Sequence, residues 1–182
     1  MLLDASDSLI LFIDFQEKLF PKITGYKEIL NCSLKIIEVA KVLNIPIILS
    51  EQYPKGLGNT VKSIKSKLRE SNFKFFEKTT FSCLANIEIR NYLKEQEKKQ
   101  IIVCGIETHI CVLQTVNDLL KIGKKVFIIN EAVGSRNEES KKIGINRNKK
   151  IGATLINFEM LLFELIRDSK HQKFKELSSL VK

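Results

Sequence analysis

Short apolar runs alternate with amphipathic segments of helix length along the whole 182-residue chain, and this pattern limits the folds open to it. The apolar runs cover residues 9–13, 46–49, 73–76, 101–104, 126–129 and 153–156. Most of them are continuously apolar rather than alternating, with Lys74 and Thr154 as the polar residues within runs, so both faces of the strands should be buried. Strand–helix alternation of this kind predicts an α/β fold with a central, mainly parallel, six-stranded sheet and helices on both sides.

Length and composition favour one soluble domain spanning residues 1–182. Hydrophobic residues make up 44% of the chain and charged residues 28%, which is ordinary for a globular protein with a full core. The apolar runs are too short to cross a bilayer. Residues 1–8 contain two Asp and no basic segment, so we expect neither a secretory signal nor a membrane partner. The four cysteines lack metal-site or disulfide spacing, and we predict a cytoplasmic protein.

The net charge of +9 raises the question of nucleic-acid binding. Most of this charge comes from Lys residues scattered over predicted helix faces and turns. No zinc-finger, basic-zipper or RNA-recognition signature accompanies them. We therefore predict a Lys-rich solvated surface and no specific nucleic-acid partner, while a nucleic-acid-associated role stays open as an alternative.

A cysteine lies in the first turn of a helix that follows a buried strand. Residues 101–104 form the predicted strand, Gly105 begins the turn, and Thr108 is the predicted N-cap that places Cys111 near the third helical position. Unpaired backbone N–H groups and the helix dipole favour a thiolate there and can support an oxyanion. Cys111 is thus a candidate nucleophile; the alternative is a small buried core residue.

Polar groups also follow the other predicted strands. Asp14 follows the first, Glu51 and Gln52 the second, and Lys78 the third. The carboxyl ends of parallel strands meet at one edge of the sheet, so these groups should converge with Cys111. A poorly hydrated Asp14 suits a base that takes the thiol proton and later returns it to a leaving amine. The Lys78 ammonium would stabilise the Cys111 thiolate and hold the Asp14 carboxylate in place. The alternatives are a helix N-cap for Asp14 and an exposed loop cation for Lys78.

Other residues near these strand ends are candidates for substrate binding. Aromatic side chains there could form apolar walls, and two glutamines could anchor an amide, although aromatics in such places are as often part of the core. Gly56 and Gly58 suggest a flexible loop at the mouth of the crevice. The substrate-binding candidates are Phe15, Gln16, Phe20, Gln52, Tyr53, Phe81 and Thr108.

Several motifs resemble those of the isochorismatase-like cysteine hydrolases, and are most similar to the isochorismatase domain-containing proteins. They are Asp14 in Leu-Ile-Leu-Phe-Ile-Asp-Phe-Gln, Lys78 in Glu-Lys-Thr-Thr-Phe-Ser, Cys111 in Gly-Ile-Glu-Thr-His-Ile-Cys-Val, residues 51–58, residues 131–136 and residues 168–176. The resemblance covers nearly the whole chain. It implies a three-layer α/β/α sandwich, a homo-oligomer (dimer or tetramer), and an Asp14–Lys78–Cys111 catalytic triad.

The resemblance also implies a cis peptide between Ile106 and Glu107, with the N–H groups of Glu107 and Cys111 forming an oxyanion hole. The expected reaction is hydrolysis of a small amide or related carbonyl compound through a thioester on Cys111. Nicotinamidases of this superfamily bind a metal through several His residues, but this chain has only His109 and His171. We therefore expect no metal and no cofactor. The alternative is a non-catalytic scaffold or partner-binding protein on the same fold.

Overall fold

Six parallel strands form one sheet in the computed structural model, which describes residues 1–181. The strand order across the sheet is β3-β2-β1-β4-β5-β6, and every pairing is parallel. The predicted parallel, six-stranded sheet is therefore confirmed. The strands are β1 (Ser8–Ile13), β2 (Ile47–Gln52), β3 (Phe73–Lys78), β4 (Gln100–Ile106), β5 (Lys125–Gly134) and β6 (Thr154–Ile156).

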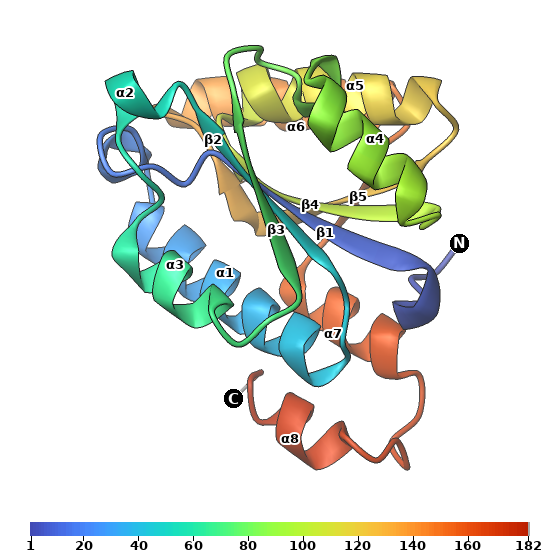
Figure 1. Cartoon of the computed structure of the whole chain (residues 1–182). Helices are drawn as coiled ribbons and strands as arrows, with labels where there is room; N and C mark the ends of the chain where they lie inside the picture. Colours follow the sequence, from blue (N-terminus) through green and yellow to red (C-terminus); the bar gives the residue numbers. More distant parts are fainter. Residues whose placement is uncertain (182) are drawn as a thin grey trace.

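Helices cover both faces of this sheet, which gives the expected three-layer α/β/α arrangement (Figure 1). One layer contains α1 (Tyr26–Val42), α3 (Lys62–Leu68), α7 (Phe158–Ile166) and α8 (Phe174–Ser178); the other contains α4 (Ile87–Glu95), α5 (Leu113–Lys121) and α6 (Glu138–Lys150). The short elements are α2 (Pro54–Leu57), the 3-10 turns η1 (Ala5–Asp7), η2 (Phe20–Lys22) and η3 (Cys83–Ala85), and the π-helical turn η4 (Thr108–Val112). Among residues 1–181, no helix is both long and apolar enough to cross a bilayer.

The central strands lie in the middle of the core. Every residue of β1 and of β4 is buried, as their continuous apolarity predicted. The edge strand β3 differs, because Lys74, Phe75 and Glu77 are exposed and only Phe76 and Lys78 are buried. The run 73–76 contains Lys74, and β3 is the outermost strand on its side of the sheet, so the apolar run was a poor guide to burial on both faces.

The strand order creates a switch point between β1 and β4. After β1 the chain continues to β2 on one side, whereas β4, reached through β3 and α4, lies on the other side of β1. Crevices in open α/β sheets form beyond the carboxyl ends of strands at such points. Asp14 directly follows β1, and η4, which carries Cys111, begins two positions after the last residue of β4. Both candidate residues therefore lie at this crevice.

Candidate active site

Asp14 is fully buried and firmly oriented at the end of β1. Its backbone has φ = 59°, a left-handed conformation that Asp tolerates better than most residues. One carboxylate oxygen, Oδ1, accepts a hydrogen bond of 2.8 Å from Ser50 Oγ. The other, Oδ2, accepts one of 2.7 Å from Lys78 Nζ. Both oxygens are therefore held by neighbours from β2 and β3, which fixes the direction in which the carboxylate points.

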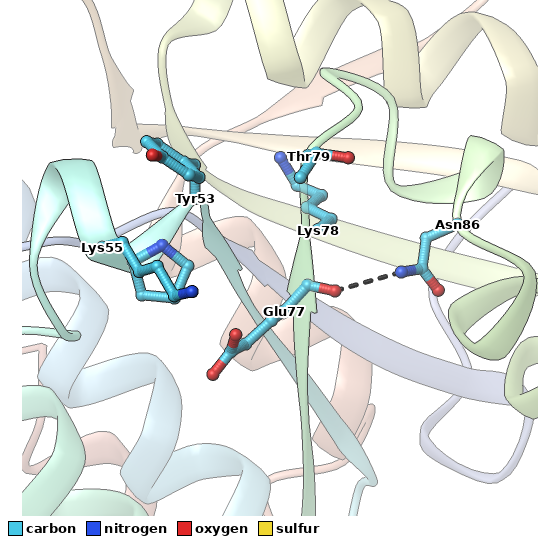
Figure 2. A pocket seen from close by; sticks show the side chains of 7 residues that line it. Tyr53, Lys55, Glu77, Lys78, Thr79 and Asn86 are labelled. Atoms are coloured by element: carbon cyan, nitrogen blue, oxygen red, sulfur yellow. Dashed lines mark hydrogen bonds between the residues drawn. The ribbon is translucent and has the colours of Figure 1, made fainter.

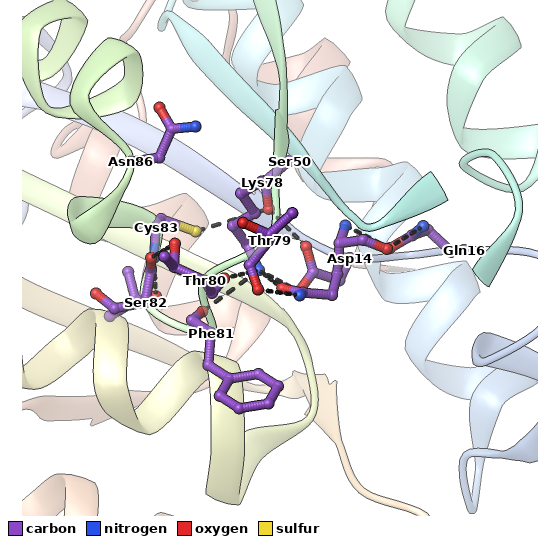
Figure 3. Close-up of polar contacts among 12 residues, drawn as sticks. Asp14, Gln16, Ser50, Lys78, Thr79, Thr80, Phe81, Ser82, Cys83 and Asn86 are labelled. Carbon is purple, nitrogen blue, oxygen red and sulfur yellow. Dashed lines mark hydrogen bonds and ion pairs between the residues drawn. The ribbon is translucent and has the colours of Figure 1, made fainter. Parts of the chain in front are cut away.

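The Lys78 ammonium is enclosed by oxygen atoms, as Figure 3 shows. Besides Asp14, it donates to Gln52 Oε1 at 2.6 Å and approaches the carbonyl oxygens of Thr80 at 3.2 Å and Phe81 at 3.3 Å. An ammonium has three N–H donors, so these four oxygens use all of them. Lys78 is thus committed to protein partners and is no exposed loop cation.

The Asp14–Lys78 pair titrates abnormally because it is buried. Burial raises the pKa of Asp14, and the Lys78 ammonium, the Ser50 hydroxyl and the Cys111 thiol offset that rise only in part. Burial lowers the pKa of Lys78, but the acidic groups of Asp14, Cys83 and Cys111 outweigh it, and the net pKa is raised. Lys78 therefore stays charged, while Asp14 holds a proton more readily than an exposed Asp does.

Cys111 lies in the π-helical turn η4, one residue before its end. The preceding Ile106–Glu107 peptide is cis. Gly105 has φ = +139°, and a Cβ there would lie 2.4 Å from the Ile13 carbonyl oxygen, so only glycine allows β4 to approach β1 this closely. Single π-helical turns of this kind are frequent at functional sites.

The predicted N-cap role of Thr108 is wrong. The cap position is Glu107, no side chain caps the turn, and Thr108 Oγ1 is buried with no partner among the described residues. The prediction assumed ordinary α-helical spacing, whereas a π-helical turn holds an extra residue and shifts the register of its start.

The resting state of Cys111 is the thiol. Burial raises its pKa, and the nearby Asp14 carboxylate raises it further, while Lys78 offsets only part of the rise. The sequence argument, that a helix start lowers the thiol pKa, omitted the desolvation that comes with only 7% exposure. A thiol in this state would need a base to act as a nucleophile, and Asp14 lines the same cavity.

Helix α6 packs against η4, the turn that carries the candidate nucleophile Cys111 (the nucleophile turn). A Cβ on Gly144 would lie 2.9 Å from the His109 backbone nitrogen, so the two backbones pack directly together. One turn further along α6, the buried Asn148 donates from Nδ2 to the Thr108 carbonyl oxygen at 3.3 Å and to the Gly144 carbonyl oxygen at 2.8 Å. The position of Cys111 thus depends on close helix packing.

A small cavity of about 210 Å³ lies beside Cys111. Of the expected substrate contacts, Gln52 and Phe81 line it. Sequence reasoning missed the side chains of Leu19, Leu57, Ile110 and Arg136, and assigned Glu107 only a backbone role. Arg136 follows the end of β5 at Gly134, but the apolar run predicted that this strand ends at residue 129, so the rule on strand ends pointed to residues 130–131 instead. The complete lining is Asp14, Leu19, Gln52, Leu57, Phe81, Glu107, Ile110, Cys111 and Arg136.

The other expected substrate contacts lie outside this cavity. Phe15 and Phe20 are buried core residues whose rings contact each other with centroids 5.1 Å apart. Thr108 is fully buried within the nucleophile turn. Gln16 Nε2 donates to the carbonyl oxygens of Gln52 at 3.0 Å and Gly58 at 2.7 Å, and its Oε1 accepts from the Gln52 N–H at 2.7 Å. Gln16 therefore anchors the loop that forms one cavity wall.

The loop around Gly56 and Gly58, which the sequence predicted to be flexible, is held in place by several hydrogen bonds. The buried Glu51 carboxylate accepts hydrogen bonds from the Thr60 N–H at 2.6 Å and from Thr60 Oγ1 at 2.7 Å. The Lys18 N–H donates to the Leu57 carbonyl oxygen at 3.0 Å. The loop that carries Leu57 is therefore a fixed wall in this structure.

Tyr53 lines a different pocket beside β2 and β3, shown in Figure 2. Successive side chains of a strand point to opposite sides, so Glu77 is exposed beside this pocket while Lys78 is buried toward Asp14. The lining residues are Tyr53, Pro54, Lys55, Glu77, Lys78, Thr79 and Asn86.

Comparison with known proteins identifies the family. The Isochorismatase domain model matches residues 8–160. The chain belongs to the isochorismatase family. Isochorismatase family protein 1A of Dictyostelium discoideum is 39% identical over 178 residues, covering 96% of this chain and 86% of that protein.

Solved structures of related proteins share the fold over almost the whole chain. A structure described as MAR1 ribonuclease from Caenorhabditis elegans is 36% identical, with a TM-score of 0.93, covering 100% of this chain and 92% of that one. YcaC from Pseudomonas aeruginosa, solved with hexane-2,5-diol and covalent acrylamide, is 25% identical with a TM-score of 0.91, covering 99% of this chain and 90% of that one. YcaC from Escherichia coli, described as an octameric hydrolase of unknown specificity, is 25% identical with a TM-score of 0.90, covering 99% and 89%. The chain thus shares its fold with relatives described as a hydrolase and as a ribonuclease.

Proposed function

We propose that this isochorismatase-family protein is a metal-independent cysteine hydrolase that cleaves a small amide or related carbonyl compound through a thioester on Cys111. The observation that carries the proposal is a buried, oriented carboxylate in the same cavity as a buried thiol: Asp14 is held at 2.7 Å by Lys78 and lines the cavity with Cys111. The covalent acrylamide in the YcaC structure supports a reactive nucleophile in a related protein, because acrylamide is a small electrophile that nucleophiles attack at its alkene carbon.

Acylation begins when Cys111 Sγ attacks the substrate carbonyl carbon and Asp14 takes the thiol proton. Attack by Sγ and proton transfer to Asp14 occur together because the raised pKa of the thiol leaves little thiolate before substrate arrives. The carbonyl oxygen becomes an oxyanion and accepts hydrogen bonds from the backbone N–H groups of Glu107 and Cys111. Lys78 keeps its proton and stabilises the Asp14 carboxylate until the proton arrives.

Asp14 then donates this proton to the leaving amine, the C–N bond breaks, and an acyl thioester remains on Cys111. A water molecule attacks the thioester carbonyl while Asp14 takes a proton from it. The C–S bond breaks, the carboxylic acid leaves, and the thiol regains its proton. The raised pKa of Asp14 suits both roles, since a base that also acts as an acid works best when its pKa lies near the operating pH.

Replacing the nucleophile tests the proposal. We expect Cys111→Ala to abolish turnover of a panel of small primary amides, and mass spectrometry of the unmodified enzyme to detect an acyl adduct on the peptide that contains Cys111. Cys32→Ala is the matched control, because Cys32 is 8% exposed and Cys111 7%, but Cys32 belongs to the apolar cluster on the other face of the sheet. Full turnover in Cys111→Ala, or no turnover and no adduct on any amide or ester, would contradict the proposal and favour a non-catalytic scaffold.

RNA hydrolysis is a second candidate, favoured by the net charge of +9 and by the C. elegans relative described as a ribonuclease. RNA binding that survives physiological salt, with cleavage that is lost in Asp14→Asn, would support it. Binding that disappears with modest salt would reduce it to nonspecific attraction between phosphates and Lys side chains.

We also propose that residues 1–182 form a single domain and that the protein assembles into a homo-oligomer. The octameric YcaC relative supports assembly, although the predicted states were a dimer or a tetramer. Light scattering of the purified protein gives the mass directly; a monomer at micromolar concentration would contradict this proposal.

A further inference from the structure

Arg136 lines the cavity beside Cys111 with most of its hydrogen-bonding capacity unused. Its Nε–H is shared between Glu107 Oε1 and Oε2, both at 3.1 Å, and its backbone N–H donates to Oε2 at 2.9 Å. Within residues 1–181, no protein group accepts a hydrogen bond from its two terminal NH₂ groups. Four N–H donors in a planar fork are therefore available to a ligand.

Glu107 fixes Arg136 without covering it. The Glu107 side chain is 5% exposed, whereas the Arg136 side chain is 58% exposed. A guanidinium anchored by Nε keeps its terminal edge free and loses less conformational entropy when it binds a ligand. The arrangement suits recognition of a planar anion better than simple neutralisation of Glu107, for which the Nε contact already suffices.

The other cation of the site is unavailable to an anion. Lys78 spends its donors on Asp14, Gln52 and two carbonyl oxygens. The resident charges cancel in pairs, Asp14 with Lys78 and Glu107 with Arg136. Apart from Cys111, the uncharged lining of the cavity is apolar except for Gln52, with the side chains of Leu19, Leu57, Phe81 and Ile110.

We propose that Arg136 binds a carboxylate on the substrate, so that the substrate class is a small amide with a short apolar middle and an anionic end. This assignment rests on the proposed function for the position of the scissile carbonyl at Cys111. The carboxylate would accept two hydrogen bonds from the terminal NH₂ groups of Arg136, while the apolar middle contacts the aliphatic and aromatic walls.

Two thiol reagents of similar size and different charge test this inference. 3-Maleimidopropionate carries a carboxylate beyond a short apolar link and N-ethylmaleimide is neutral, and Cys111 Sγ would add to the ring alkene of either one while the thiol proton ends on the neighbouring carbon. We expect the rate ratio of 3-maleimidopropionate to N-ethylmaleimide at Cys111 to fall about 10- to 100-fold in Arg136→Gln, as expected for the loss of a charge-assisted hydrogen bond. Arg136→Lys should keep part of the preference, because it keeps the charge but loses the fork.

Arg147→Gln is the control, because it removes an equal charge from an exposed position on α6 outside the cavity. A general disturbance of the site would slow both reagents together and leave the ratio unchanged. An unchanged ratio in Arg136→Gln overturns the inference.

Calorimetry separates this inference from the proposed function. The probe is succinamate, a four-carbon monoamide with a carboxylate, titrated into Cys111→Ala protein with and without Arg136→Gln. Binding that weakens about 10- to 100-fold with Arg136→Gln supports the anion site even if Cys111 proves unreactive. Equal binding to both proteins, or none to either, overturns the anion site whatever the reactivity of Cys111.

Discussion

The two halves of the site are held in place by different kinds of interaction. In the half built from β1, β2 and β3, hydrogen bonds and an ion pair hold both oxygens of Asp14, and Lys78 is enclosed by oxygens. In the half built from β4, η4 and α6, the position of Cys111 is set mainly by close backbone packing between Gly144 and His109. There, Thr108 Oγ1 and Asn148 Oδ1 are buried without partners among residues 1–181.

This difference matches the demands of the roles proposed for Asp14 and Cys111. A base must keep a defined pKa, which depends on charges and hydrogen bonds close to the carboxylate. A nucleophile must reach the carbonyl carbon at the correct distance, which depends on the placement of its backbone. We therefore expect changes in the first half to alter proton transfer and pH dependence, and changes in the second half to alter reactivity without moving the pH profile.

The largest effect should come from the carboxylate itself. Asp14→Asn keeps the shape of the side chain but removes the base, and we expect kcat/KM to fall by about 10²- to 10⁴-fold. Alkylation of Cys111 should slow as well, because the thiol loses its proton acceptor. Asp118→Asn is the control, since Asp118 accepts a hydrogen bond from Ser82 Oγ and lies outside the cavity. Equal activity in Asp14→Asn and the unmodified enzyme would remove Asp14 from the mechanism.

Lys78→Met should change both stability and pH dependence. Removing the ammonium leaves a buried carboxylate without its partner, and we expect unfolding by urea to show a loss of about 3–5 kcal/mol. Burial already raises the pKa of Asp14, and Lys78 opposes that rise. The active form needs ionised Asp14, so activity falls as pH drops through this pKa, and losing Lys78 moves the acid limb of kcat/KM to higher pH.

The shift of the acid limb separates an electrostatic role from a purely structural one. Lys65→Met is a suitable control, because it removes an exposed ammonium from α3. If Lys78→Met loses activity while its acid limb stays at the original pH, Lys78 only supports the fold, and the proposed coupling with Asp14 fails.

In the half of the site held by backbone packing, the methyl group added by Gly144→Ala should lower both stability and activity. Gly→Ala in a helix normally stabilises it by about 0.5–1 kcal/mol. At Gly144 the new Cβ would meet the His109 backbone nitrogen at 2.9 Å, so the sign reverses and we expect a loss of about 1–3 kcal/mol. A displaced nucleophile turn should lower kcat/KM about 10- to 100-fold with the pH profile unchanged. A shifted acid limb in Gly144→Ala would show that the two halves are not independent.

The sequence predicted the half of the site around Asp14 and Lys78 better than the half around Cys111. Continuous apolar runs revealed the parallel sheet, and the meeting of strand ends brought Asp14 and Lys78 to one crevice, where they lie 2.7 Å apart. Thr108 was assigned to the wrong role because no local pattern distinguishes a π-helical turn from an α-helical start. Phe15 and Gln16 directly follow Asp14, which lines the cavity. Phe15 instead packs against other rings, and Gln16 forms hydrogen bonds to a distant loop. Such choices depend on contacts between segments far apart in the chain.

The smallest effect should come from Asn148, which supports the nucleophile turn through one side-chain amide. Asn148→Ala removes the donors to the Thr108 and Gly144 carbonyl oxygens, but it also removes the buried Oδ1 that has no partner. These two changes oppose each other, so we expect a loss of only about 1 kcal/mol in urea unfolding and less than about tenfold in Cys111 alkylation. Asn146→Ala is the control, because Asn146 is exposed on the same helix. If Asn148→Ala costs as much activity as Gly144→Ala, a hydrogen bond rather than backbone packing holds the nucleophile, and the contrast between the two halves disappears.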